Sequence, residues 1–461
     1  MSRKLMHLLH GPSGLIAGAV LSTWIGSAEA RAANPAAGPK VPVEKFTLPN
    51  GLKVVLSEDH TAPVVTVYTT FRVGGAHEVK GSTGFAHLFE HMMFNGSRNV
   101  PEGAYAYYLD ATGGEVNANT EHDRTNYYQT VPSNYLEGIL HLESNRMANL
   151  EITEAALANE KSVVKEEVRQ QQENTPYARV MLLDWPAVAY SSWEYAHSIY
   201  GSMEDLSNAP VQAFVDFFKK YYAPNNATLV ICGDFEASKA RALVEKYYGP
   251  LQAGAPLTHT FPEEAPQTAA VLREIADPLA PVPLTLISFD APAPRTADAT
   301  ALELLAGVLT DGASSRMQRV LVDEKKVASA VNLQVGFPWV TYGPSQLVAL
   351  LVASQGTKLA DLRAGFWAEV EKVQRGGVTA AEVERARAKL RKRHVDGLGS
   401  TFYKASQLAT YEAFFGGAEQ FAGDIARFDR VTPADLKRVA TKYITQPASV
   451  TFDVNPGAAQ P

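Results

Sequence analysis

Residues 84–97 read GFAHLFEHMMFNGS and place two histidines and a glutamate within five positions of an otherwise apolar run. His87, Glu90 and His91 are spaced i, i+3 and i+4, so on a helix they share one face. Burying three ionisable side chains among phenylalanines and methionines is costly unless each finds a partner. Any fold of this chain must therefore bring compensating groups opposite this face of the helix.

The same spacing suits a divalent metal. Zn²⁺ accepts imidazole nitrogens and carboxylate oxygens in a tetrahedral site, and a catalytic site leaves one position for water. Glu90, between the two histidines, is then placed to take a proton from that water. The pattern H-x-x-E-H, the reverse of H-E-x-x-H, is typical of metallopeptidases. Short patterns also arise by chance, and a structural cluster of hydrogen-bonded side chains is the alternative interpretation.

A third protein ligand must come from elsewhere in the chain. A predicted helix over residues 159–168 carries three glutamates, and two of them, Glu160 and Glu167, lie two turns apart on one face. Three valines lie on or near that face, which is therefore predicted to be buried: Val163, Val164 and Val168. Glu166 points away. We predict Glu167 as the ligand and Glu160 as a carboxylate that orients an imidazole; a solvated acidic helix is the alternative.

The N-terminus predicts export. Arg3 and Lys4 precede an apolar block over residues 15–25 and a small-residue cleavage pattern at Ala28-Glu29-Ala30, which is the order of a secretory signal peptide. A transit peptide or an uncleaved anchor is the alternative. The apolar block is shorter than the ~20 residues that a membrane-spanning helix needs. We expect an exported protein without a membrane span, located in the periplasm.

Charge and cysteine content exclude several classes of protein. The net charge is −7 and no long Lys/Arg run occurs, so neither nucleic acid nor an anionic membrane is expected as a partner. Cys232, the only cysteine, follows an apolar run and is predicted to be buried and inert. Because the chain has a single cysteine, a metal cluster held by several thiolates is also excluded. Without disulfides, an exported chain must be stabilised by large cores, and 46% hydrophobic residues supply the material.

The chain is predicted to contain two similar units. A helix end in the first unit (Phe214, Phe217, Lys220, Tyr221) recurs in the second (Leu436, Val439, Lys442, Tyr443). The predicted ranges are 1–30 for the signal peptide, 31–42 for a flexible leader, 43–251 for the first domain, 252–268 for a proline-rich linker, 269–456 for the second domain and 457–461 for a tail.

Local patterns predict the secondary structure of both units. Asn50-Gly51 between two β-prone runs indicates a hairpin, and Thr379 to Glu382 form a capping box that begins a long helix. Strands are expected over 64–73, 125–131, 228–231, 284–289 and 347–352, and helices over 104–111, 136–147 and 154–172. Strand runs mixed with long helices favour an α+β fold with mainly antiparallel sheets.

On these residues the chain resembles the pitrilysin/insulinase family of zinc peptidases, and within it the half-length chains similar to mitochondrial processing peptidase and its bacterial relatives. The resemblance covers nearly all of the chain beyond the predicted signal peptide. It rests on Gly84-x-x-His87-x-x-Glu90-His91-Met92-x-Phe94, Gly113-Gly114-x-x-Asn117-Ala118-x-Thr120, Asn126-Tyr127-Tyr128, Glu160 to Glu167 and Gly233-Asp234. In the family, the number of residues between the second histidine and the third ligand is the number that separates His91 from Glu167. The resemblance therefore implies Glu167, and not Glu166, as the third ligand.

The resemblance implies a function and a fold. It implies an endopeptidase with one zinc ion per chain, two homologous domains, and a clam-shell chamber on dimerisation that takes oligopeptides or unfolded peptides. It also implies that substrate binds as an added strand at a sheet edge, at Asn117 and Ala118. That stretch is polar and alternating, as an exposed edge strand would be; a surface loop is the alternative.

Two departures from the family pattern concern the second unit. Leu304, Gly307 and Val308 stand where the first unit has its motif, so the second unit has no metal site. Active members also use an Arg and a Tyr seven residues apart, and here Val322 and Ser329 occupy those positions. This implies a heterodimer with a homologous subunit that lacks the zinc motif and supplies the Arg/Tyr pair. The alternatives are a homodimer with another donor, or a non-catalytic structural or peptide-binding subunit.

Overall fold

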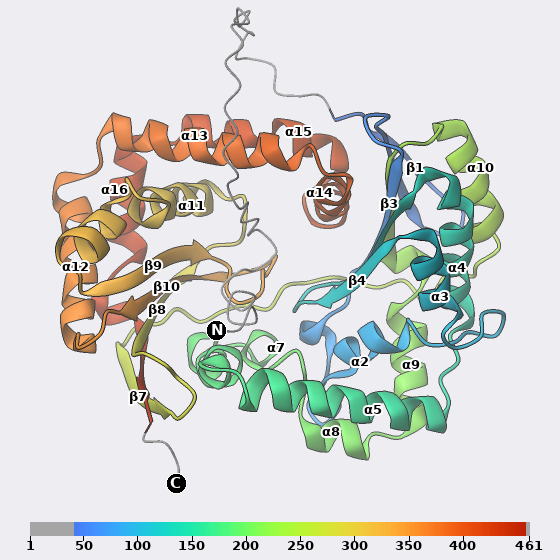
Figure 1. The fold of residues 1–461 in the computed structure, drawn as a ribbon, viewed down its shortest axis with the longest axis horizontal. Helices are drawn as coiled ribbons and strands as arrows, with labels where there is room; N and C mark the ends of the chain where they lie inside the picture. The colour runs from blue at the N-terminus through green and yellow to red at the C-terminus, as the bar shows by residue number, and fades with distance from the viewer. Residues whose placement is uncertain (1–40, 458–461) are drawn as a thin grey trace, which may run out of the picture.

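The structure is a computed structural model that describes residues 41–457. The predicted signal peptide (1–30), nearly all of the predicted leader (31–42) and most of the predicted tail (457–461) lie outside these residues. The chain forms two lobes, each built on one sheet with helices packed against it (Figure 1). Within residues 41–457, no helix is long and apolar enough to cross a membrane.

The first lobe contains a six-stranded sheet in the order β1-β2-β6-β3-β5-β4. Its strands are β1 (Glu44–Thr47), β2 (Lys53–Glu58), β3 (Val64–Phe71), β4 (Glu115–Thr120), β5 (Thr125–Pro132) and β6 (Ala227–Gly233). β1 and β2 form the predicted hairpin, and Gly51 adopts the left-handed φ of 88° that its turn requires. Only β2 and β6 pair in parallel, and β4 lies at the sheet edge.

The second lobe repeats this topology in five strands, in the order β7-β11-β8-β10-β9. The strands are β7 (Val271–Asp277), β8 (Leu284–Ala291), β9 (Ala328–Val335), β10 (Ser345–Ala353) and β11 (Val450–Pro456). β7 and β11 pair in parallel and the other neighbours are antiparallel, as in β2-β6-β3-β5-β4. This correspondence confirms the α+β fold of two homologous units with mainly antiparallel sheets.

Helices pack against both sheets. In the first lobe they are α2 (Phe85–Met92), α3 (Ala104–Thr112), α4 (Leu136–Asn149), α5 (Glu154–Val168), α6 (Pro186–Ala189), α7 (Trp193–Ala196), α8 (Met203–Asn208), α9 (Val211–Tyr221) and α10 (Ala237–Tyr248). In the second they are α11 (Ala297–Thr310), α12 (Leu359–Gly376), α13 (Ala380–Gly397), α14 (Thr401–Phe414), α15 (Phe421–Asp424) and α16 (Pro433–Tyr443). The predicted capping box of α13 is confirmed.

The lobes exchange elements across the space between their sheets. α14, from the second lobe, packs on the first sheet (Figure 1), where Leu408 joins a buried cluster with Tyr68, Val230 and Cys232. Burial raises the pKa of Cys232 to about 11, as expected for an inert thiol. In return, the first lobe's η4 (Val180–Asp184) and α6 pack on the second sheet, with Trp185 fully buried. Each sheet is thus covered on one side by the other lobe.

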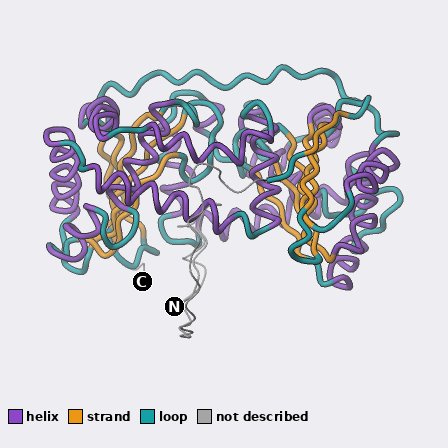
Figure 2. Tube along the Cα trace, turned by 90° about the horizontal axis from the view of Figure 1, so that it is seen from above, coloured by secondary structure: helices purple, strands orange, loops and turns teal. Residues whose placement is uncertain are grey.

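A long segment joins the lobes. Residues 252–268, the predicted linker, contain no helix or strand, and a long loop runs from one lobe to the other in Figure 2. The predicted domain boundaries stay predictions, because the exchanged helices leave each lobe dependent on residues from both halves of the sequence.

We predict that Trp185→Ala weakens the contact between the lobes. Trp185 is fully buried, and its Nε1–H donates to Ser288 Oγ at 2.8 Å. Loss of its volume should lower the free energy of unfolding by about 3–5 kcal/mol, measured by urea unfolding followed by circular dichroism. Val395→Ala, at a side chain that is 53% exposed, is the control and should change it by less than about 0.5 kcal/mol. A wild-type unfolding curve for Trp185→Ala would contradict this packing.

Candidate metal centre

α2 is fixed in place by its apolar face. Phe85, Leu88, Phe89 and Met92 are buried in the first lobe's core, and the Phe85 ring stacks on Phe214 at 4.0 Å between centroids. Because these residues occupy one side of the helix, the motif side chains project from the other side, toward α5 and β4. Figure 1 shows α2 between these two elements.

The structure brings His87, His91 and Glu167 together. His91 Nε2 lies 3.0 Å and His87 Nε2 lies 3.7 Å from Glu167 Oε2, and one ligand atom from each residue fits within 4.8 Å of the others. Donor atoms of a tetrahedral zinc site are about 3.4 Å apart. Burial lowers the pKa of His87 to about 4, so its imidazole is neutral at pH 7, the form that ligates a metal. The three side chains therefore fit a zinc ion.

Glu160 lies behind His91. Its Oε2 is 3.9 Å from His91 Nδ1, which is too long for a direct hydrogen bond. Its Oε1 accepts a hydrogen bond from Asn95 Nδ2 at 3.1 Å, so the carboxylate is held in place. The structure thus places Glu160 next to one of the two motif imidazoles, that of His91, and its orienting role stays a prediction.

Glu90 lies beside the ligand cluster and is tied to β4. Its Oε2 accepts a hydrogen bond from Thr120 Oγ1 at 2.6 Å. Burial raises the pKa of Glu90 to about 7, and the Thr120 hydrogen bond opposes that rise. A carboxylate with a pKa near neutrality suits a general base that must both take and return a proton. Thr120 belongs to the family pattern, but that pattern does not predict its hydrogen bond to Glu90.

The predicted substrate strand lies at the open edge of the first sheet. Among the described strands, β4 pairs only with β5, where Asn117 lies opposite Tyr128. The side chain of Asn117 is exposed, whereas Ala118 is buried and faces the side of α2. The edge prediction for this stretch is therefore confirmed, and its backbone groups on the unpaired side can accept a further strand. Peptide binding there stays a prediction.

One prediction on α5 was wrong. Val163 is 45% exposed, while Val164 and Val168 are buried. The buried stripe of α5 runs through Leu157, Glu160, Val164 and Val168, and Val163 lies about 100° around the helix from Val164. Glu167, at the margin of this stripe, keeps partial access to solvent. Glu166 is exposed and pairs with Arg169, as expected of a residue outside the site.

An aromatic ring also packs against this site, and no pattern in the sequence predicts it. The Tyr200 ring lies 4.7 Å from the His87 ring in a T-shaped contact. Tyr200 is brought there by the loop between α7 and α8, more than a hundred residues along the chain from His87. No spacing rule relates the two positions, and only the tertiary fold reveals the contact.

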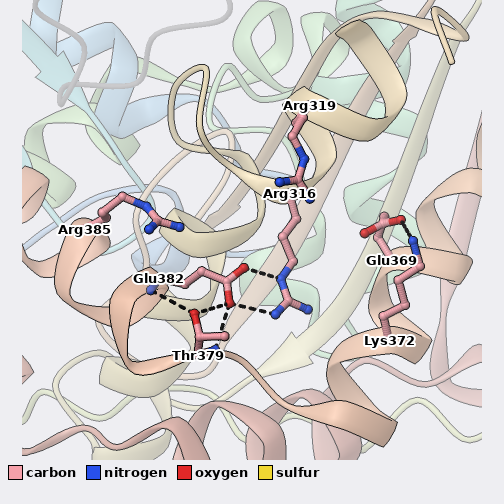
Figure 3. A pocket seen from close by; sticks show the side chains of 7 residues that line it. All are labelled: Arg316, Arg319, Glu369, Lys372, Thr379, Glu382 and Arg385. Atoms are coloured by element: carbon pink, nitrogen blue, oxygen red, sulfur yellow. Dashed lines mark hydrogen bonds and ion pairs between the residues drawn. The ribbon is translucent and has the colours of Figure 1, made fainter. Parts of the chain in front are cut away.

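In the second lobe, α11 has the buried apolar side chains Leu304 and Val308 where α2 has its two histidines. α13 packs against α11 as α5 packs against α2, and Arg393 on α13 lies as far from its N-cap residue Thr379 as Glu167 lies from Thr153. A pocket nearby, of about 340 Å³, is lined by charged side chains: Arg316, Arg319, Glu369, Lys372, Glu382 and Arg385 (Figure 3). Arg316 forms two hydrogen bonds with Glu382, and Lys372 pairs with Glu369, so four of these six charged side chains form ion pairs with one another.

Neither position of the missing Arg/Tyr pair offers a substitute donor. Val322 packs partly buried against the second lobe's core. Ser329, at the start of β9, has its Oγ 3.3 Å from the carbonyl oxygen of Ala353 and serves its own sheet.

Family models match most of the described chain. The model described as insulinase (peptidase family M16) matches residues 53–201, and the model described as peptidase M16 inactive domain matches residues 208–390. The first contains the motif of α2 and the cluster with Glu167, and the second contains the positions of Leu304, Val308, Val322 and Ser329.

Individual relatives agree with these matches. Zinc protease PqqE of Helicobacter pylori is 27% identical, over 90% of this chain and 93% of its own. The probable mitochondrial-processing peptidase subunit beta of Arabidopsis thaliana is 25% identical, over 86% of this chain and 75% of its own. A protease structure from H. pylori superposes with a TM-score of 0.84 at 26% identity, covering 90% of this chain and 100% of that chain. The periplasmic protease PqqL of Escherichia coli shares the fold (TM-score 0.76, 17% identity), and this chain corresponds to 48% of its length.

Proposed function

This chain belongs to the insulinase family of peptidases (family M16), and from that membership and the geometry of the site we propose that it is a zinc-dependent endopeptidase. The observation that carries the proposal is the convergence of His87, His91 and Glu167 beside a buried Glu90. In this proposal, one zinc ion per chain is held by these three side chains. When bound, it would act as a Lewis acid that polarises the scissile carbonyl and lowers the pKa of water.

The protein's own residues would carry the proton and position the peptide. Glu90, with its pKa near neutrality, would take the proton of the attacking water and return it to the leaving amine. The hydrogen bond from Thr120 fixes the carboxylate at the end of β4. An extended peptide paired to β4 at Asn117 and Ala118 would run past this carboxylate. Pairing at the strand edge uses the backbone N–H and C=O groups of an extended peptide. These groups are free in oligopeptides and unfolded segments, which are therefore favoured as substrates over folded proteins.

We further propose that the chain is the catalytic subunit of a heterodimer. Val322 and Ser329 support this, because neither can donate to an oxyanion as an Arg and a Tyr do. A homologous subunit without the zinc motif would supply that pair across a chamber formed on dimerisation. Export to the periplasm belongs to the same proposal and rests on the pattern of residues 1–30.

The ligand assignment predicts which glutamate on α5 holds the metal. Wild-type protein should bind one zinc ion per chain, and Glu167→Ala should lose most of it, since two imidazoles alone form an incomplete site. Glu166→Ala is the matched control, because Glu166 is the exposed neighbour and pairs with Arg169. Zinc is measured by atomic emission after gel filtration. Equal zinc in Glu167→Ala and wild type would refute the assignment.

If Glu90 is the general base, replacing it should slow peptide cleavage without removing the zinc ion. Glu90→Gln keeps the shape and the hydrogen bond from Thr120 but cannot take a proton. We expect wild-type zinc content with cleavage of an unstructured peptide slowed by about 10²–10⁴-fold. The rates are compared under single-turnover conditions in the presence of the partner subunit. Cleavage by Glu90→Gln at the wild-type rate would exclude Glu90 as the base.

The heterodimer proposal predicts low activity for the isolated chain. Adding a homologous subunit that carries R-x-x-x-x-x-x-Y and lacks H-x-x-E-H should raise peptide cleavage by about 10²-fold or more, the typical contribution of one oxyanion donor. The same subunit with its Arg and Tyr replaced by Ala is the control and should bind without stimulating cleavage. Full activity of the chain alone would contradict the requirement for a partner.

A further inference from the structure

Glu78, outside the motif, lies at the start of the helix that carries the motif. The N-cap residue of α2 is Gly84, at φ 83°, and it has no side chain to cap the helix. Glu78 takes over that role: its Oε2 accepts the N–H of Gly84 at 2.8 Å, and its Oε1 accepts the N–H of Ala86 at 2.9 Å. Its side chain is fully buried. The carboxylate thus satisfies free amides at the positive end of the α2 dipole.

His197 provides the counter-charge for this carboxylate. Its Nδ1 lies 2.7 Å from the carbonyl oxygen of Trp193, and its Nε2 lies 3.3 Å from Glu78 Oε2. Because a carbonyl oxygen only accepts, Nδ1 carries a hydrogen. Burial acts to lower the pKa of His197, but the hydrogen bond and the charge of Glu78 raise it above its usual value. The imidazole also stacks on the Trp193 ring at 4.0 Å, which favours a cationic ring. The two side chains form a largely buried ion pair, whose two charges cancel.

The segment that follows His197 touches the first metal ligand. The Tyr200 ring packs on the His87 ring. Gly201 lies so close to Gly84 that a Cβ on Gly201 would come within 2.2 Å of the Gly84 nitrogen. The loop carrying His197 and Tyr200 is therefore in contact both with the first turn of α2 and with the ligand itself.

His87 lacks the contact that usually orients a metal-binding histidine. Such a histidine normally donates its second ring nitrogen to a carboxylate or carbonyl group. Among the described residues, the buried Nδ1 of His87 has no hydrogen-bond partner. Its orientation therefore depends on the position of α2 and on the Tyr200 ring, both of which are coupled to Glu78 and His197.

We propose that Glu78 and His197 are positioning residues for the metal centre. Their ion pair holds the first turn of α2 against the loop 197–201, and this contact presents Nε2 of His87 to the zinc ion. The inference rests on the proposed zinc function and assigns to it two residues that lie 119 positions apart in the sequence.

Glu78→Gln tests this inference. Glutamine keeps the volume of the side chain, but one of its two ends donates, so one of the α2 amides loses its acceptor and His197 loses its counter-charge. We expect the zinc dissociation constant, measured by competition with a chelator on the full chain, to rise by about 10- to 100-fold. Glu58→Gln is the matched control: Glu58 accepts the N–H of Ala237 at the start of α10, away from the metal centre. It should keep wild-type zinc affinity.

A second variant and a second measurement separate positioning from stability. His197→Phe keeps a ring to stack on Trp193 and removes both donors, and it should also raise the zinc dissociation constant. Unfolding of the zinc-free proteins is measured in parallel. Wild-type zinc affinity in the folded Glu78→Gln and His197→Phe proteins, with only their unfolding altered, would overturn the inference. If Glu167→Ala loses zinc in that case, the zinc proposal itself stands; absence of zinc from the wild type would overturn both.

Discussion

Between α2 and α5, the first lobe buries ionisable side chains in surroundings that are otherwise apolar. His87 is 4% exposed and Glu160 is 7% exposed, and burial raises the pKa of Glu90, on the same helix as His87, to about 7. Such a cluster is costly in an apolar core unless its charges are compensated. A cation held by His87, His91 and Glu167, as proposed, would offset that cost, and a solvated acidic helix does not explain why Glu160 is buried. In the second lobe, the apolar residues Leu304 and Val308 stand where α2 has histidines, so no ionisable side chain is buried at these two positions.

The fold brings this cluster to the edge of a sheet. The apolar face of α2 packs on the first core, its other face meets α5, and Thr120 links Glu90 to β4. The exchange of α14 and of the segment around Trp185 holds the two sheets in a fixed relation. The chemical groups thus lie beside an edge strand that pairs on one side only, which suits cleavage of a peptide bound in extended form.

The sequence predicted those features that depend on local spacing. The i, i+3, i+4 pattern located the cluster on one helix face, Asn50-Gly51 located the first hairpin, and the repeat of a helix end indicated two related units. Features that depend on tertiary contacts could not be predicted from the sequence. Glu78 meets His197 across 119 positions, Tyr200 reaches His87 through a loop, and α14 packs on the other lobe's sheet. Val163 was misplaced because a valine near a buried face is not necessarily on it.

X-ray absorption at the zinc edge of the zinc-loaded full chain shows directly whether a zinc ion binds between α2 and α5. If His87, His91 and Glu167 hold the ion, the spectrum should show a four-coordinate shell of nitrogen and oxygen at about 2.0–2.2 Å, with the outer-shell scattering of two imidazoles. A shell of six oxygens, or one that lacks imidazole scattering, would contradict this assignment.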